Sequence, residues 1–424
     1  MRKFGVLVVG ASALAVLGTQ DSASAQQRPG VDVEREFERN ETVGTRPRPD
    51  FDARGVRTGG FLFNLDADGE VRYDDNVFRR ETNTNDDTIL VFRPRAGLYS
   101  GWSRHAVNVY GDAEIGRFQD FDNNDYEDWT LGTDGRLDFT RSSFLTARIV
   151  TNQRHEDRGS PDEVNGINPT TYKLIEGDAA FDYRPTRWGL RLNSESNHFR
   201  YDNTATSTGL VNQQDRNRDE HYLSATGSYE IQPAYDAFLR IGYNRRKYDN
   251  VPDDEGFNRN SEGWAGVLGA RIDLTGVLFG DVFAGYIQQR YEDDAFGDVD
   301  GPQVGAALFW NPTGLTSLSF RASRAIQETT LAGASGFWST TLGAGIDHEL
   351  RRNILLNGQL TFATNEYNGI SRDDELARIG IGGTYLINRH WRASANYSFD
   401  RRDSNQAGAS FDKNLVILRI TARL

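Results

Sequence analysis

The chain has 424 residues, no cysteine and a formal net charge of −13. The absence of cysteine excludes disulfides, thiolate metal sites and a lipid-modified N-terminal cysteine, and the negative charge argues against nucleic acid as a partner. Hydrophobic residues make up only 37% of the chain, and beyond the first 25 residues no segment approaches about 18 consecutive apolar residues, which excludes transmembrane helices.

Residues 1–25 have the three parts of a secretory signal peptide. Arg2 and Lys3 supply the charged start, residues 4–17 are apolar, and Ala23-Ser24-Ala25 forms a small-x-small cleavage site. A membrane anchor is the alternative, but the apolar run is too short and ends in polar residues. We therefore expect cleavage before Gln26 and export to the periplasm or outer membrane of a Gram-negative bacterium.

Residues 26–59 are polar, highly charged and poor in aromatic residues. Such a segment buries too little apolar surface to fold on its own, and Pro47 and Pro49 would interrupt a helix. We expect a flexible periplasmic N-terminal extension that precedes the folded domain.

From Phe61 to Leu424 the chain alternates between apolar and polar residues in stretches of about ten. In residues 391–400, for example, apolar residues occupy the odd positions and polar or charged residues the even ones. Short turns, such as 140–143 and 311–314, alternate with long polar connections, such as 155–169 and 202–219. A soluble sandwich would also alternate, but its charged face would meet water and its apolar face would pack in a core shared with a second sheet. A propeller repeat has a length similar to the spacing of the turns, but it lacks a lipid-type outer face, and its blade signatures are not found in this sequence. Residues 60–424 are therefore predicted to form an all-β, up-and-down antiparallel barrel of about 18 strands in the outer membrane, with short periplasmic turns and longer extracellular loops.

The tryptophans support a membrane barrel independently of the alternation. All of them fall at the expected strand ends, where indole rings favour the headgroup layer of a bilayer. A soluble core would hold tryptophan in the middle of strands as often as at their ends. The expected aromatic girdle consists of Trp102, Trp129, Trp188, Trp264, Trp310, Trp338 and Trp391.

The polar face of the strands is expected to line a hydrated lumen. It mixes both signs of charge with amide and hydroxyl side chains, which suits a neutral or weakly charged hydrophilic solute such as a sugar. The alternative is that opposite charges pair across strands and only hold the wall together. Lumen candidates are Arg72, Arg136, Arg148, Arg191, Arg240, Arg271, Arg321, Asp134, Glu176, Asp178 and Glu195.

No pattern in the chain points to an enzyme, a cofactor or a metal centre. The six histidines are scattered, no two share a strand face at metal-ligand spacing, and no Gly-x-Ser-x-Gly motif is present. Acidic clusters such as 253–255 and 292–294 would suit Ca²⁺ or cation-bridged lipopolysaccharide, but solvated loops are the simpler interpretation.

The start of the expected barrel carries a recognisable motif. Gly55-Val56-Arg57-Thr58-Gly59-Gly60-Phe61 is followed by Tyr73-Asp74-Asp75-Asn76-Val77-Phe78. This combination resembles the β-barrel porin 2 family, found near exopolysaccharide and capsule gene clusters of Gram-negative bacteria. The resemblance implies export of a surface polysaccharide, alongside a periplasmic polysaccharide-export protein that would dock on the N-terminal extension. Tyr73, Asp74, Asp75, Asn76 and Phe78 would lie at the outer rim, where the carboxylates order the loop or coordinate a cation.

Three functions remain open from the sequence. The first is a passive conduit for exopolysaccharide or capsular polysaccharide. The second is a general diffusion porin for small hydrophilic solutes, which an inward constricting loop with segregated arginines and acids would favour. The third is an outer-membrane enzyme or a surface adhesion barrel. The expected partners are outer-membrane lipid and lipopolysaccharide, a polysaccharide or small solute in the lumen, and the periplasmic protein, with no nucleic acid.

Overall fold

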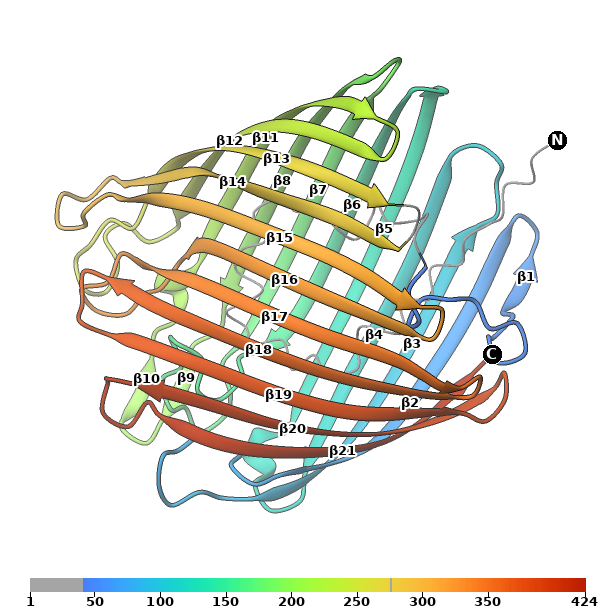
Figure 1. Ribbon diagram of the computed structural model, residues 1–424. Helices are drawn as coiled ribbons and strands as arrows, with labels where there is room; N and C mark the ends of the chain where they lie inside the picture. Colours follow the sequence, from blue (N-terminus) through green and yellow to red (C-terminus); the bar gives the residue numbers. More distant parts are fainter. Residues whose placement is uncertain (1–40, 275–276) are drawn as a thin grey trace.

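The computed structural model describes residues 41–274 and 277–424, which form a closed barrel of 18 antiparallel wall strands (Figure 1). The expected signal peptide lies outside the described residues, as do residues 26–40 of the expected N-terminal extension. Among the described residues, no helix is long and apolar enough to cross a membrane. The wall strands are β2 (Phe61–Asp74), β3 (Asp87–Ser100), β4 (Ala106–Phe118), β5 (Tyr126–Thr140), β6 (Ser143–His155), β7 (Thr171–Tyr183), β8 (Trp188–Tyr201), β11 (Arg218–Gln232), β12 (Tyr235–Tyr248), β13 (Ser261–Leu274), β14 (Leu278–Tyr291), β15 (Val299–Thr313), β16 (Thr316–Gln327), β17 (Gly336–Arg351), β18 (Ile354–Asn368), β19 (Asp373–Leu386), β20 (Trp391–Ser404) and β21 (Phe411–Arg423).

Each wall strand pairs with its neighbours in chain order, and the first and last strands close the ring. β2 pairs with β21 from Asp66↔Arg423 to Asp74↔Leu415, so the first and last wall strands are not left as free edges that could aggregate. The short strand β1 (Val56–Thr58) pairs antiparallel with the start of β2 and is not one of the 18 wall strands. β9 (Thr204–Thr206) and β10 (Gly209–Val211) form a small hairpin in the loop between β8 and β11. The predicted up-and-down barrel is confirmed.

The outer face of the wall is apolar and exposed. Ile149 and Leu268 are 60% and 66% exposed, and similar residues recur at every second position around the ring. Leaving such side chains in water costs about 1.5–3 kcal/mol each, so this face suits lipid. Five tryptophans of the expected girdle are exposed: Trp102, Trp188, Trp264, Trp310 and Trp391. Trp129 is partly exposed on the lipid-facing side of β5.

The hairpin formed by β16 and β17 leaves the wall near its long-loop end. Pairing between β15 and β16 stops at Gly305↔Ser323. Beyond that point, Ile326 pairs with Trp338 of β17. By strand alternation, Ile326 and Trp338 belong to the same face of the hairpin as Phe320, which is exposed to lipid. However, Ile326 is fully buried, so the end of this hairpin does not face lipid.

The end of the hairpin instead packs against the inside of the barrel. Ile326 forms a cluster with Ile287 and Val299, which lie on the inward register of β14 and β15, and Trp338 packs against the same cluster. A Cβ added to Gly301 of β15 would lie 3.2 Å from the Trp338 ring. Trp338 therefore does not take the expected girdle position, because the end of its strand lies inside the barrel, against β14 and β15.

The N-terminal residues 41–55, called here the rim segment, follow the short-turn end of the barrel. Val43 is almost fully buried there, and this is the part of the expected N-terminal extension that the structure describes. Figure 1 shows it in blue near the ends of β16 and β17. Its contacts follow the rim from β15 to β21: Glu41 O with Asn311 Nδ2 at 2.9 Å, Val43 N with Ser317 Oγ at 2.8 Å, Arg48 with Glu349 at 2.9 Å, Pro49 O with Arg389 Nε at 3.0 Å, and Gly55 N with Leu424 O at 3.2 Å.

Candidate functional site

The inner wall of the barrel is a charged surface whose side chains meet in rows across the strands. Residues that pair across neighbouring strands share a face. One such row runs from Asp134 through Arg148 and Asp178 to Glu195. The residues between them along each strand, such as Ile149, are exposed on the lipid face. The row therefore faces the lumen.

The structure places the expected lumen residues on this inward register, and most of them have polar neighbours. Arg72 forms ion pairs of 2.9 Å with both Glu70 and Glu114. These contacts also support the interpretation that opposite charges hold the wall together, so pairing alone defines no solute site. The contacts of the others are Arg136 with Asp138 at 2.9 Å, Arg148 with Asp178 at 3.1 Å, Arg191 with Asp182 at 3.4 Å, Arg271 with Asp281 at 3.4 Å, Arg240 with Thr226 at 3.2 Å, Asp134 with Asn108 at 2.9 Å, Glu176 with Asn152 at 3.0 Å, Glu195 with Asn193 at 2.7 Å, and Arg321 over the Phe309 ring at 5.9 Å.

The motif of residues 73–78, called here the rim motif, lies at the long-loop end of the barrel and joins the first wall strand, β2, to the last, β21. The Asp74 carboxylate lies 2.7 Å from Lys413 Nζ, and Asp75 accepts hydrogen bonds from the backbone and side chain of Asn414 at 2.6 and 2.7 Å. Asn76 is almost fully buried and donates to the carbonyl of Asp412 at 2.8 Å. These contacts order the end of the seam between β2 and β21, whereas Tyr73 points to the outer face and donates to Asp86 at 3.0 Å.

Two loops at the long-loop end meet across the bore. The β6–β7 loop (residues 156–170) and the β16–β17 loop (residues 328–335) start from distant parts of the wall. Six wall strands separate them on one side (β8 and β11 to β15) and eight on the other (β18 to β21 and β2 to β5). Asp162 Oδ1 accepts hydrogen bonds from the Thr329 hydroxyl and, at 3.1 Å, from the backbone N–H of Thr330. We call this pair of joined loops the loop bridge.

The β6–β7 loop is held in place by buried arginines. Arg158 donates to Asn124 at 2.8 Å and to the carbonyl of Gly166 at 2.7 Å, and it packs over the Phe78 ring of the rim motif at 5.6 Å. Phe78 itself stacks edge-on against Phe121 at 5.1 Å. From the far wall, Arg402 of β20 donates to the carbonyl of Gly159 in the same loop.

A second buried contact fixes the beginning of this loop. Arg216 forms a two-pronged ion pair with Glu156, with N–O distances of 2.7 and 3.1 Å. Burial raises the pKa of Glu156, and the guanidinium of Arg216 opposes that rise. Paired Arg–carboxylate geometry of this kind adds orientation as well as energy, so the loop has one defined path.

The β16–β17 loop is fixed from the opposite side. Glu328 forms a buried ion pair with Arg246 of β12 and accepts a hydrogen bond from the Tyr248 hydroxyl at 2.8 Å. Arg259 donates to the carbonyls of Thr329 at 3.1 Å and Ala334 at 2.8 Å. The sequence did not lead us to expect any residue of the loop bridge in the lumen. The arginines within these long polar loops are the signal that could have suggested buried anchors.

The comparison with protein families decides the identity of the barrel. A family model described as Putative beta-barrel porin 2 matches residues 48–424. The chain belongs to this family. It is an outer-membrane β-barrel porin, as its rim motif and its apolar outer face indicated.

Solved structures similar to this porin come from Pseudomonas aeruginosa. The structure of OccK3 (OpdO) is 17% identical, with a TM-score of 0.45, over 85% of this chain and 96% of that chain. OpdL is 15% identical, with a TM-score of 0.45, over 87% and 100% of the two chains. The outer membrane protein OpdK is 12% identical, with a TM-score of 0.45, over 85% and 99%. No curated protein matches the sequence.

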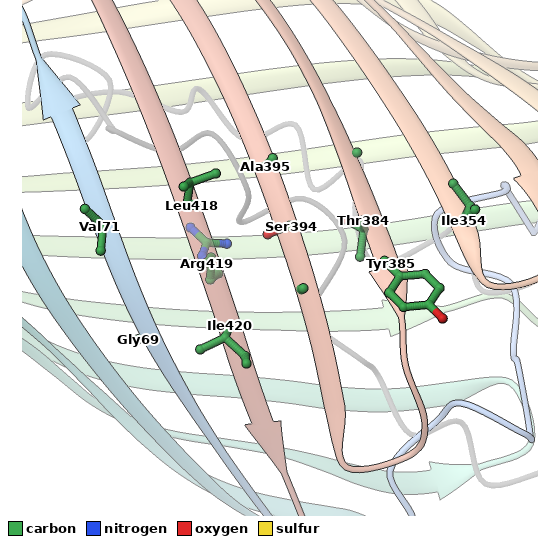
Figure 2. Close-up of a pocket in the computed structure, with 12 residues that line it drawn as sticks. Gly69, Val71, Ile354, Thr384, Tyr385, Ser394, Ala395, Leu418, Arg419 and Ile420 are labelled. Atoms are coloured by element: carbon green, nitrogen blue, oxygen red, sulfur yellow. The ribbon is translucent and has the colours of Figure 1, made fainter.

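A shallow hollow also marks the outside of the porin, over β2 and β18 to β21 (Figure 2). Small residues such as Gly69, Ala393 and Ala395 leave room between Leu418 and Ile420, which are exposed on the lipid face. The hollow belongs to the lipid-facing surface and not to the bore. Within residues 41–274 and 277–424, no group of three or more His, Cys, Asp or Glu side chains is placed to hold a metal ion.

Proposed function

We propose that this porin is a passive diffusion channel for small hydrophilic solutes, narrowed near its extracellular mouth by the loop bridge. The single observation that carries the proposal is the contact of Asp162 with Thr329 and Thr330. It ties together two loops from distant parts of the wall, so the opening is divided into smaller passages. Narrowing of this kind restricts large solutes and leaves small ones free to pass.

The inner wall supports a hydrophilic solute. The inward register of β18 holds Asn357, Gln359 and Thr361, whose amide and hydroxyl groups both donate and accept hydrogen bonds. Charged residues are unevenly distributed around the ring. Arginines dominate at the seam of β20, β21, β2 and β3, whereas the row of Asp134, Arg148, Asp178 and Glu195 has an excess of acids. This separation of charge is the arrangement that we expected of a diffusion porin.

The export of a polysaccharide is less well supported by this arrangement. A polymer must pass through the bore as a continuous chain, so the loop bridge would have to open. Its anchors are buried: Glu328 and Arg246 are 2% and 3% exposed, and Arg216 is 3% exposed. Opening of the loops would have to separate these buried ion pairs and their hydrogen bonds, which disfavours repeated opening during polymer transport.

The test combines channel and cell measurements. We expect the purified porin to conduct ions in planar bilayers and to make liposomes swell quickly in monosaccharides and increasingly slowly in longer oligosaccharides. Deletion of the gene should leave secreted polysaccharide unchanged. A barrel without current or swelling would overturn the proposal, and loss of secreted polysaccharide on deletion would restore the export hypothesis in its place.

A further inference from the structure

We propose that the inner wall at the seam of β20, β21, β2 and β3 holds a binding subsite for a small oxyanion, such as the carboxylate or phosphate group of a passing solute. Arg95, Arg392 and Arg423 would be its ligands. The inference rests on the proposed function only in that the solute reaches the site through the bore.

Strand register brings the three arginines onto adjoining rows of the inward face. In one row, Arg95 of β3 pairs with Asp66 of β2, and Asp66 pairs with Arg423 of β21. In the next row, Asp68 pairs with Thr421, which pairs with Arg392 of β20. Directly paired side chains have Cβ atoms about 4.5–5.5 Å apart, so the three guanidinium groups surround one small area of wall.

The buried acids of this area are paired with arginines of the same stretch of wall. Asp68 and Glu70 are buried. Arg95 lies 2.9 Å from Asp68, and Arg419 lies 2.7 Å from Glu70. Arg93 forms ion pairs with Glu70 at 3.1 Å and with Glu114 at 2.6 Å. Arg72 pairs with the same two acids. Glu70 and Glu114 are therefore neutralised by arginines that are not among the proposed ligands, whereas Asp68 is paired with Arg95.

Arg392 and Arg423 do not share in this neutralisation. Arg392 Nε donates to the Thr421 hydroxyl at 3.1 Å, and Arg423 Nη2 donates to the carbonyl of Phe51 at 2.7 Å. Within the part of the chain that the structure describes, neither arginine has a carboxylate within 4.0 Å, and Arg423 Nε is buried without a hydrogen-bond partner. This part of the wall has an excess of one positive charge. Six arginines, Arg72, Arg93, Arg95, Arg392, Arg419 and Arg423, share it with five acids, Asp66, Asp68, Glu70, Asp112 and Glu114.

This excess is unusual in a chain of net charge −13. Arg392 lies in the field of Arg423 and Arg95 as well as of Asp68 and Asp66, so like charges face one another in a partly buried place. An oxyanion offsets that repulsion, and guanidinium groups bind carboxylate and phosphate through two parallel hydrogen bonds. Both Arg392 and Arg423 are only half-buried, which leaves them accessible from the bore.

The subsite lies at the end of the bore opposite the loop bridge. Arg423 is next to the C-terminal Leu424, and its contact with Phe51 ties it to the rim segment. A solute that has passed the loop bridge would therefore meet the arginines as it leaves towards the periplasm. A local positive site counteracts the general repulsion between an acidic channel and an anionic solute.

The test measures block of the channel current by succinate and by inorganic phosphate, added separately to the periplasmic side in planar bilayers. The decisive variant is Arg392→Gln with Arg423→Gln. Its matched control, Arg136→Gln with Arg321→Gln, removes the same two charges elsewhere on the inner wall. We expect wild-type porin to show concentration-dependent block, the decisive variant to need at least about tenfold more anion, as loss of about 1.4 kcal/mol of binding implies, and the control to stay within about twofold.

Block of similar strength in all three proteins, or conducting wild-type channels that neither anion blocks, would overturn the subsite. Arg392→Lys with Arg423→Lys keeps the charge and guards against misfolding of the glutamine variant, and it should retain most of the block. If the porin does not conduct, the proposed function fails, and calorimetry of phosphate binding in detergent then decides the subsite. Binding that is lost in the glutamine variant supports it, and no binding to the wild-type protein refutes it.

Discussion

Thr329 donates its hydroxyl to the Asp162 carboxylate, and this contact joins two loops that start from distant parts of the barrel wall. The same carboxylate oxygen accepts the backbone N–H of Thr330 at 3.1 Å. One side chain therefore receives two donors from the opposing loop. The bore is bridged by hydrogen bonds to a single charged group, and the bridge should be sensitive to the loss of that group.

Replacing Asp162 with alanine should loosen the loop bridge. Hydrogen bonds to a charged group contribute about 1.5–3 kcal/mol, so the equilibrium for separation of the loops should shift by roughly tenfold or more. We expect Asp162→Ala channels to show a higher mean conductance and more frequent fluctuations in planar bilayers. Asp298→Ala serves as the control, because Asp298 is exposed and lies 3.8 Å from its partner Arg290. Identical conductance and noise in wild type and Asp162→Ala would show that the contact does not shape the passage.

Glu328 is expected to be the strongest anchor of the β16–β17 loop. Glu328→Gln leaves the Arg246 guanidinium buried without its counter-charge, and loss of one partner of a buried pair costs about 3–5 kcal/mol. The variant should unfold at a lower temperature in detergent and be cut more quickly by protease in residues 328–335.

A triple variant separates the charge from the packing. Glu328→Leu, Arg246→Met and Tyr248→Phe together remove the carboxylate, the Arg246 guanidinium that pairs with it and the Tyr248 hydroxyl that donates to it. Such apolar replacements are often neutral or stabilising. The triple variant should recover most of the lost stability, and a further decrease would mean that the ion pair itself holds the loop.

The wall of the barrel was predictable from the sequence because its signal is local. Alternation along residues such as 391–400 assigns each side chain to lipid or lumen without any knowledge of distant residues. The expected lumen residues followed from the same period, and the register Asp134↔Arg148↔Asp178↔Glu195 agrees with it. The asymmetry of turns and loops then gave the number and direction of the strands.

The loop bridge was not predictable in this way. Asp162 and Thr329 are separated by 167 residues, and a polar loop has the same composition whether it lies over the bore or enters it. Trp338 illustrates the same limit. Its position at a strand end is typical of a girdle, but its environment depends on where β16 parts from β15 at Ser323, and nothing in the local sequence specifies that point.

The rim motif should contribute to closure of the barrel through Asn76. Its side chain donates to the carbonyls of Arg80 and Asp412, each at 2.8 Å, and accepts the N–H of Arg80 at 2.9 Å. Asn76→Ala leaves these buried groups unpaired, which costs about 1–3 kcal/mol. We expect a lower temperature for the loss of the folded, heat-modifiable band on denaturing gels, whereas Thr84→Ala, an exposed change in the same loop, should have no effect. Equal melting of Asn76→Ala and wild type would assign the motif a role other than holding β2 to β21.

The loop that carries Arg216 should lose local stability as pH rises. Burial, reinforced by the neighbouring Asp254 carboxylate, raises the pKa of Asp215 to about 6, and Asp215 Oδ1 is buried without a hydrogen-bond partner among the described residues. The ordinary pKa of an aspartate in an unfolded chain is about 3.9. Between these two values the folded loop binds a proton that the open loop releases, so stability falls as pH rises from about 4 to about 6 and stays low above that range. Hydrogen exchange of residues 203–217, corrected for intrinsic rates, should therefore be slower at acid pH than at neutral pH in wild type, and Asp215→Asn should remove most of that difference. Asp412→Asn, an exposed change on β21, should leave the difference intact. A difference that persists in Asp215→Asn would assign the pH response to another group, with Glu156 as the next to test because its pKa is also raised by burial.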